Sequence, residues 1–193
     1  MMDKDTKNIM EYETVALDDE NSALVIIDQT KLPGETVLIS LHTGQEIWDA
    51  IYLLKVRGAP AIGVAAAFGI YLLAKQIETQ EYESFYQAFH KQKEYLNSAR
   101  PTAVNLSWAL NRMERVCTEN REKPVEEIKA LLRAEAVAMK EEDIRVCKAI
   151  GEHGLTLVKP GDGILTHCNA GQLATCKYGT ATAPIYLGQE RGY

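Results

Sequence analysis

The sequence predicts an α/β protein. Two short apolar runs rich in β-branched residues, 23–27 and 36–41, predict a small antiparallel sheet, and helical patterns follow them. Residues 161–175 predict a second unit, because an apolar run there meets a glycine turn and then a helix-compatible segment. We therefore expect an N-terminal domain of sheet and helices, 1–122, linked by a long helix to the start of a parallel-sheet domain within 123–193.

The N-terminal strands are expected to form an antiparallel meander. Residues 28–34 lie between the two apolar runs and are rich in turn-forming residues. Thr43 and Glu46 then have the spacing of a capping box, in which each side chain binds the backbone N–H of the other residue. We expect this box to start a helix with Ile47 and Ile51 on its apolar face.

Composition excludes several classes of function. The chain has 193 residues, a formal net charge of −6 and no cluster of lysine and arginine, so no nucleic acid or anionic membrane is expected as a partner. The four cysteines show no metal-type spacing, which predicts no metal site and a reduced, cytoplasmic protein. The longest uncharged run, Gly58 to Ala74, would span only about 25 Å as a helix, so it predicts a buried helix rather than a membrane span.

Two arginines precede prolines that are expected to open helices. Arg57 comes before Pro60, and Arg100 comes directly before Pro101. A cation beside a helix N-terminus is disfavoured unless an anion is shared there, and helix N–H groups with forked guanidinium groups bind phosphate. We expect both arginines to face one cleft, with guanidinium groups within about 10 Å of each other. The alternative, which spacing alone leaves open, is two surface arginines bound to nearby carboxylates or carbonyls.

The second half of the chain should begin with a long helix. Pro124 opens the pattern, which is expected to continue to Ile150 and to stop at Gly151. A last helix is expected over about 179–189, where Pro184 is tolerated only in the first turn.

Cys168 is the candidate reactive group. It is expected at the carboxyl end of the predicted strand, where α/β sheets bind ligands, and facing a helix N-terminus that would lower the pKa of its thiol. The alternative is a buried cysteine that packs as a small hydrophobe. His167 should point to the opposite face of the strand, so we expect it to pack or support the site rather than pair with Cys168.

Several segments together resemble the methylthioribose-1-phosphate isomerase family. They are Asp28 to Pro33, Val56 to Gly63, Arg100 to Trp108, Thr166 to Gly171 and Tyr178 to Ala181. They cover nearly the whole chain in the family's order. The wider superfamily contains the regulatory subunits of translation initiation factor 2B and ribose-1,5-bisphosphate isomerase.

The resemblance implies an aldose–ketose isomerase of methionine salvage that converts 5-methylthioribose 1-phosphate to 5-methylthioribulose 1-phosphate, as a homodimer and without a cofactor. Arg57, Gly58 and Ala59 would then correspond to the substrate-binding loop, and Arg100 to a second phosphate contact. Cys168 would correspond to the catalytic cysteine. The second domain would be Rossmann-like.

The resemblance also leaves alternatives open. The family's catalytic aspartate, a substrate-binding glutamine and an Asn-Lys pair would lie beyond Tyr193, so we expect an inactive fragment with an incomplete second domain. Its segment 161–193 should be poorly packed, swapped onto a neighbouring molecule, or paired with a strand of another copy. The substrate could instead be 5-deoxyribose 1-phosphate or ribose 1,5-bisphosphate. A non-catalytic regulatory protein that senses a sugar phosphate or nucleotide is the other alternative, although Cys168 and the Arg57 loop favour the isomerase.

Overall fold

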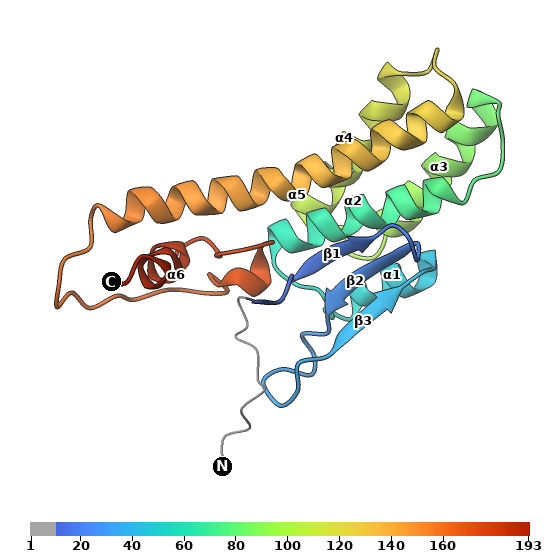
Figure 1. Ribbon diagram of the computed structural model, residues 1–193. Helices are drawn as coiled ribbons and strands as arrows, with labels where there is room; N and C mark the ends of the chain where they lie inside the picture. The colour runs from blue at the N-terminus through green and yellow to red at the C-terminus, as the bar shows by residue number, and fades with distance from the viewer. Residues whose placement is uncertain (1–10) are drawn as a thin grey trace.

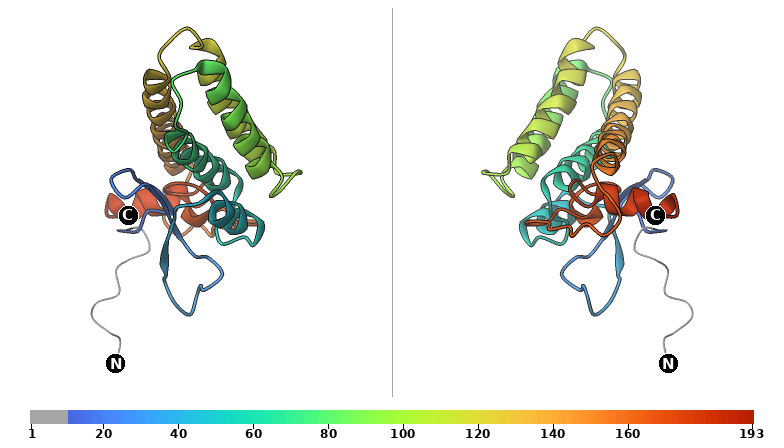
Figure 2. Two further views of the ribbon diagram at one scale, coloured as in Figure 1. Left: turned by 90° about the vertical axis from the view of Figure 1, so that its right-hand side faces the viewer. Right: turned by 90° about the vertical axis from the view of Figure 1, so that its left-hand side faces the viewer.

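The computed structural model describes residues 11–193 as a small sheet packed against a helical bundle (Figure 1). The strands are β1 (Val15–Asp18), β2 (Ala23–Ile27) and β3 (Leu38–Leu41). The helices are α1 (Gly44–Tyr52), α2 (Ala59–Lys75), α3 (Tyr82–Asn97), α4 (Val104–Glu119), α5 (Val125–Leu155) and α6 (Ala183–Glu190), with a short 3-10 helix, η2 (Gln172–Ala174). Figure 2 shows that the sheet and α6 lie on the same side of helices α2 to α5.

The sheet confirms the predicted meander. Its strands are antiparallel in the order β1-β2-β3, with Val25 opposite Ala16 on one side and Ser40 on the other. The capping box of α1 is also confirmed: the Glu46 N–H donates to Thr43 Oγ1 at 3.2 Å, and the Thr43 N–H donates to Glu46 Oε2 at 2.9 Å.

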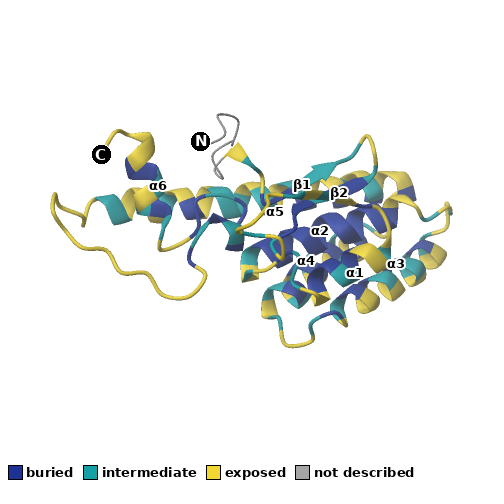
Figure 3. Ribbon diagram, turned by 90° about the horizontal axis from the view of Figure 1, so that it is seen from below, coloured by how far each residue is buried: buried dark blue, intermediate teal, exposed yellow. Residues whose placement is uncertain are grey.

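Helix α2 is the centre of the main hydrophobic core. It begins with Pro60 in its first turn, as predicted, and all its residues from 61 to 74 are buried (Figure 3). Its many alanines and glycines leave little side-chain bulk, so α4 and α5 pack closely on it. The sheet and α1 cover its other side.

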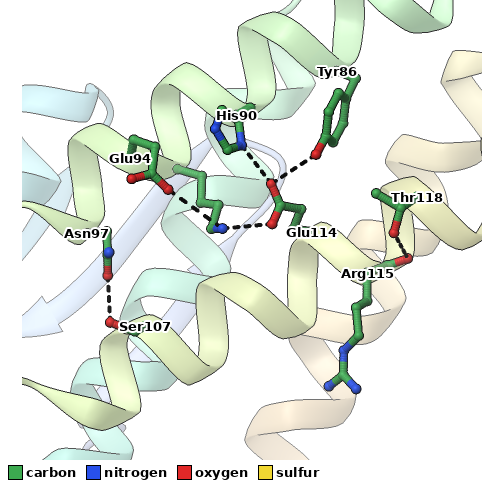
Figure 4. A network of polar contacts seen from close by, with 9 residues as sticks. Tyr86, His90, Glu94, Asn97, Ser107, Glu114, Arg115 and Thr118 are labelled. Atoms are coloured by element: carbon green, nitrogen blue, oxygen red, sulfur yellow. Dashed lines mark hydrogen bonds and ion pairs between the residues drawn. The ribbon is translucent and has the colours of Figure 1, made fainter.

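Helices α3 and α4 are joined by a polar cluster at the edge of this core (Figure 4). Lys93, only 6% exposed, donates to Glu114 Oε2 at 2.7 Å. The other oxygen of Glu114 lies 2.7 Å from His90 Nδ1 and accepts the Tyr86 hydroxyl at 3.2 Å. Burial acts to raise the pKa of Glu114, but hydrogen bonds from Lys93 and His90 outweigh it and lower that pKa.

Helix α5 connects two hydrophobic clusters. Its first half contributes Ile128 and Leu132 to the main core, and its second half packs Cys147 against Tyr178 and Ala183. The helix continues past the predicted stop at Gly151. A Cβ at that glycine would lie 3.0 Å from the Ala183 carbonyl oxygen, so the missing side chain serves the packing of α6 and does not end α5.

The strand predicted to end at Cys168 is absent from the described residues. Residues 158–168 form neither helix nor strand, and Leu165 is 97% exposed. A strand needs a neighbouring strand to pair its backbone groups, and β1 to β3 pair only with one another. The predicted start of a parallel sheet is therefore not present here. The expected poor packing holds for 158–168 but not beyond, because α6 packs on α5.

Two helix starts also differ from prediction. Helix α4 begins at Val104 rather than at Pro101, because a turn closed by the Ala103 N–H and the Arg100 carbonyl comes first. Helix α6 begins at Ala183, later than expected, although Pro184 does lie in its first turn. Within residues 11–193, no helix combines the length and apolar character that a membrane crossing requires.

Candidate functional site

A cavity of about 500 Å³ lies between the β2–β3 loop, the start of α2 and the segment before α6. It is lined by Gln29, Leu32, Pro33, Arg57, Thr166, Cys168, Asn169, Ala170, Gly171, Gln172, Leu173, Ala174, Thr182 and Tyr186. The structure thus brings together Arg57 and Cys168, which are 111 positions apart in the sequence. Gln29, Thr182 and Tyr186 were not among the predicted site residues. Only Gln29 could have been found, since it lies in the first motif of the resemblance.

Gly58 sets the distance between the two walls of this cavity. Its φ is +92°, and a Cβ there would lie 2.3 Å from Ala174 Cα. Only glycine allows this backbone conformation together with so close an approach. The residue after Arg57 is therefore in direct contact with the segment that follows Cys168.

The β2–β3 loop is fixed to the opposite wall by hydrogen bonds. Asp28 Oδ1 accepts the Thr30 N–H at 3.0 Å and the Thr30 hydroxyl at 2.6 Å, which forms a tight turn around Gln29. Gln29 Nε2 then donates to the Leu173 carbonyl oxygen at 2.7 Å. Residues far apart in sequence are held together by polar contacts at the edge of the cavity.

Arg57 and Arg100 line different cavities. Arg100 lines a second cavity of about 370 Å³, together with Gly58, Ala59 and the turn before α4. Residues that line the two cavities are neighbours in sequence, because Arg57 of the first cavity directly precedes Gly58 of the second. Within residues 11–193, neither guanidinium group forms an ion pair or a hydrogen bond, which disfavours the alternative of two arginines bound to nearby carboxylates or carbonyls.

Cys168 is exposed, so the alternative of a buried hydrophobic cysteine is wrong. Its φ of 62° lies in the left-handed region, which is uncommon outside glycine. It does not face the N-terminus of an α-helix, because the next helical residues are the three of η2. The predicted stabilisation of a thiolate by a helix dipole therefore has no basis in this structure. His167 is exposed and does not line the cavity, so the packing role predicted for it is wrong.

The other cysteines are buried thiols of low acidity. Burial raises the pKa of Cys117 to about 12 and that of Cys147 to about 11, and it also raises the pKa of Cys176. Cys168 is the one exposed thiol of the four. Within the part of the chain that the structure describes, no group of three or more histidine, cysteine or acidic residues could hold a metal ion.

Comparison with known proteins decides the family. The sequence model of the Initiation factor 2 subunit family matches residues 55–186. The chain belongs to the Initiation factor 2 subunit family. That match contains Arg57, Arg100 and Cys168.

Among curated members of this family, the methylthioribose-1-phosphate isomerase of Symbiobacterium thermophilum is 61% identical over 183 residues, which are 95% of this chain and 51% of that protein. The 5-deoxyribose 1-phosphate isomerase of Clostridium botulinum is 53% identical over 176 residues, 91% of this chain and 50% of that protein. The chain spans about half the length of the curated relatives it matches.

Solved structures agree with the fold. The 5-methylthioribose 1-phosphate isomerase from Pyrococcus horikoshii superposes with a TM-score of 0.87 at 40% identity, covering 93% of this chain and 50% of that one. The delta subunit of translation initiation factor eIF-2B from A. fulgidus gives 0.84 at 39% identity, covering 93% and 52%. The small sheet and six helices correspond to the N-terminal part of these proteins.

Proposed function

We propose that this chain forms a substrate-binding part of an aldose–ketose isomerase that converts 5-methylthioribose 1-phosphate to 5-methylthioribulose 1-phosphate. The observation that supports the proposal is the cavity lined by Arg57 and Cys168, in a chain 61% identical to a methylthioribose-1-phosphate isomerase. Residues matching the other half of the relatives would complete the site.

The substrate's phosphate is the proposed ligand of the arginines. Its dianion would bind the guanidinium groups of Arg57 and Arg100, with Gly58 and Ala59 at the start of α2 offering backbone N–H groups. Both guanidinium groups are available, since residues 11–193 provide no partner for either. Because Arg57 directly precedes Gly58, which lines the cavity of Arg100, a phosphate bound beside Gly58 would be shared between the two arginines.

The reaction needs proton transfer at the sugar. The bond between C1 and the ring oxygen breaks and that oxygen gains a proton. The hydrogen on C2 moves to C1, as a proton through a base or as a hydride, while the C2 hydroxyl loses its proton and becomes a carbonyl. Cys168 is the proposed base or stabilising group for this transfer, since its thiol lines the same cavity as Arg57.

A second candidate substrate is 5-deoxyribose 1-phosphate, favoured by the 53% identity to an isomerase of that name. A regulatory role like that of the initiation factor subunits is less well supported, because the curated relatives at 61% and 53% identity are isomerases, whereas the delta subunit is 39% identical. We also propose that the protein works in the cytoplasm as a homodimer. We further propose a division into parts 1–122 and 123–193, the second of which would begin a Rossmann-like domain. The separate cluster of Cys147, Tyr178 and Ala183 supports a second part, while Val125 to Met139 of α5 pack in the main cluster and connect the two parts.

Calorimetric titration with 5-methylthioribose 1-phosphate tests this function. We expect binding by the 193-residue chain, at least tenfold weaker binding by Arg57→Ala and Arg100→Ala, and unchanged binding by Arg115→Ala, a matched control whose arginine is exposed on α4. Proton NMR should show no turnover by the chain alone. The proposal fails if the wild-type chain does not bind the sugar phosphate, or if Arg57→Ala binds it as well as Arg115→Ala does.

A further inference from the structure

The cavity wall that carries Cys168 has no sheet to support it. Residues 168–179, here called the cavity segment, contain no strand and only the three helical residues of η2. Yet Thr175 and Cys176 within the segment are 1% and 4% exposed. A buried backbone without regular structure needs other partners for its N–H and C=O groups.

On its sheet side, the cavity segment is held by two N-terminal residues. The Thr14 hydroxyl donates to the Gln172 carbonyl oxygen at 3.1 Å, and Gln29 donates to the Leu173 carbonyl oxygen at 2.7 Å. Both contacts satisfy carbonyl groups. The buried N–H of Cys176 is not a partner in either contact and needs an acceptor elsewhere.

On the side opposite the sheet, the partner is Asp143 of α5. Its Oδ2 accepts the Cys176 N–H at 2.7 Å, and its Oδ1 lies 3.9 Å from the Cys147 Sγ one helical turn later. Burial raises the pKa of Asp143, and the hydrogen bonds from Cys176 offset this only in part. Asp143 thus accepts the Cys176 N–H although its surroundings disfavour the charged form of the carboxyl group.

Asp143 does not line the cavity of Arg57 and Cys168. It borders a separate cavity of about 160 Å³ between α2, α4 and α5, together with Trp108 and Val146. It therefore contacts the cavity segment from behind. Thr175 continues the support, because its hydroxyl accepts the Gly179 N–H at 3.1 Å.

We propose that Asp143 is a positioning residue of the isomerase site: its carboxyl oxygen holds the Cys176 backbone and so fixes the cavity segment, with Cys168, opposite Arg57. This inference rests on the proposed function for its consequence in substrate binding. Its structural content, the anchoring of the segment, is independent of the substrate.

Three variants of the full chain test it. Asp143→Ala removes the acceptor, Asp143→Asn keeps an acceptor oxygen without the charge, and Glu141→Ala removes an exposed carboxylate from the same helix as a control. Hydrogen exchange at the Cys176 amide should become at least tenfold faster in Asp143→Ala, while the amides of α2 exchange at the wild-type rate. Asp143→Asn should restore most of the protection, and Glu141→Ala should change nothing.

Two further measurements connect the anchor to the site. Asp143→Ala should change the rate of Cys168 alkylation by iodoacetamide at least threefold and weaken binding of 5-methylthioribose 1-phosphate at least fivefold, with Asp143→Asn close to wild type in both. If Asp143→Ala does not fold, the exchange rate of the Cys176 amide is compared between the wild-type chain and Asp143→Asn instead. Equal exchange at Cys176 in Asp143→Ala and Glu141→Ala overturns the proposal, as does an Asp143→Asn variant no better than Asp143→Ala. If the wild-type chain does not bind the sugar phosphate, the proposed function fails, while the exchange and alkylation results still decide the role of Asp143.

Discussion

Replacing Gly58 by alanine should destabilise the fold by several kcal/mol. The residue has φ +92° and ψ +139°, a backbone conformation that costs a residue with a Cβ roughly 1–3 kcal/mol. The new methyl group would also lie 2.3 Å from Ala174 Cα and 2.7 Å from Ala174 O, contacts that are too short. Overpacking of this kind typically costs about 1–3 kcal/mol, which gives a total of about 2–6 kcal/mol. Relief of the clash would move α2 and the cavity segment apart.

Urea unfolding followed by circular dichroism measures this loss. Gly163→Ala is the matched control, because a Cβ there meets no atom within 4 Å, and it should change the free energy of unfolding by less than about 0.5 kcal/mol. Adding Ala174→Gly to Gly58→Ala should recover only part of the loss, since the Ala174 Cα and O contacts remain. A Gly58→Ala protein as stable as Gly163→Ala would refute the reasoning, and full recovery in the double variant would contradict the role given to the backbone contact.

Three other predictions concern charges and thiols. Iodoacetamide at neutral pH should modify Cys168 before the three buried cysteines, as peptide mass mapping would show; equal modification of all four would contradict the site. Burial acts to raise the pKa of Asp19, but hydrogen bonds from basic and tyrosine side chains outweigh it and lower that pKa to about 2. Ionised Asp19 thus stabilises the fold by on the order of 1 kcal/mol after solvent screening, and this stabilisation is present above about pH 4 and is lost as the pH falls towards 2. Thermal unfolding of Asp19→Asn should lack this part of the acid dependence. Lys93→Met should lower the free energy of unfolding measured in urea by about 2–3 kcal/mol, because it leaves Glu114 partly buried without its cation. The double variant Lys93→Met with Glu114→Met should recover part of that loss. A double variant no more stable than the single one would count against this account.

Local signals were sufficient for the elements that depend on neighbouring residues. The Thr43–Glu46 capping box and Pro60 in the first turn of α2 both depend on the backbone of one helical turn, and both predictions are confirmed. Gly151 was misread because a glycine that ends a helix and a glycine that admits another helix have the same sequence signal. Only the position of Ala183 separates the two meanings.

The candidate site was predictable in part, for the same reason. The resemblance pointed to Arg57 and Cys168, which the structure places on one cavity. The prediction of a strand before Cys168 was wrong because a strand exists only when it pairs with a neighbouring strand, and no local sequence pattern supplies that neighbour. Asp143 lies on a charged face of a long helix, where its pattern is that of an ordinary surface carboxylate. Its contact with Cys176 arises from tertiary structure alone.

The length of α5 has a mechanical consequence. Its 31 residues form one continuous helix. Its N-terminal half packs in the same core as α2, and its C-terminal half carries Asp143 and the surface on which α6 packs. The cavity segment is therefore held both by this helix, through Asp143, and by the core of α2, through the contact of Gly58 with Ala174. A bend of about 5° midway along α5 would move its C-terminal end, about 20 Å away, by about 2 Å, but it would move Asp143, which lies close to the middle of the helix, by less than about 0.5 Å. The contact that holds the cavity segment is thus made from the part of α5 that bending of the helix moves least.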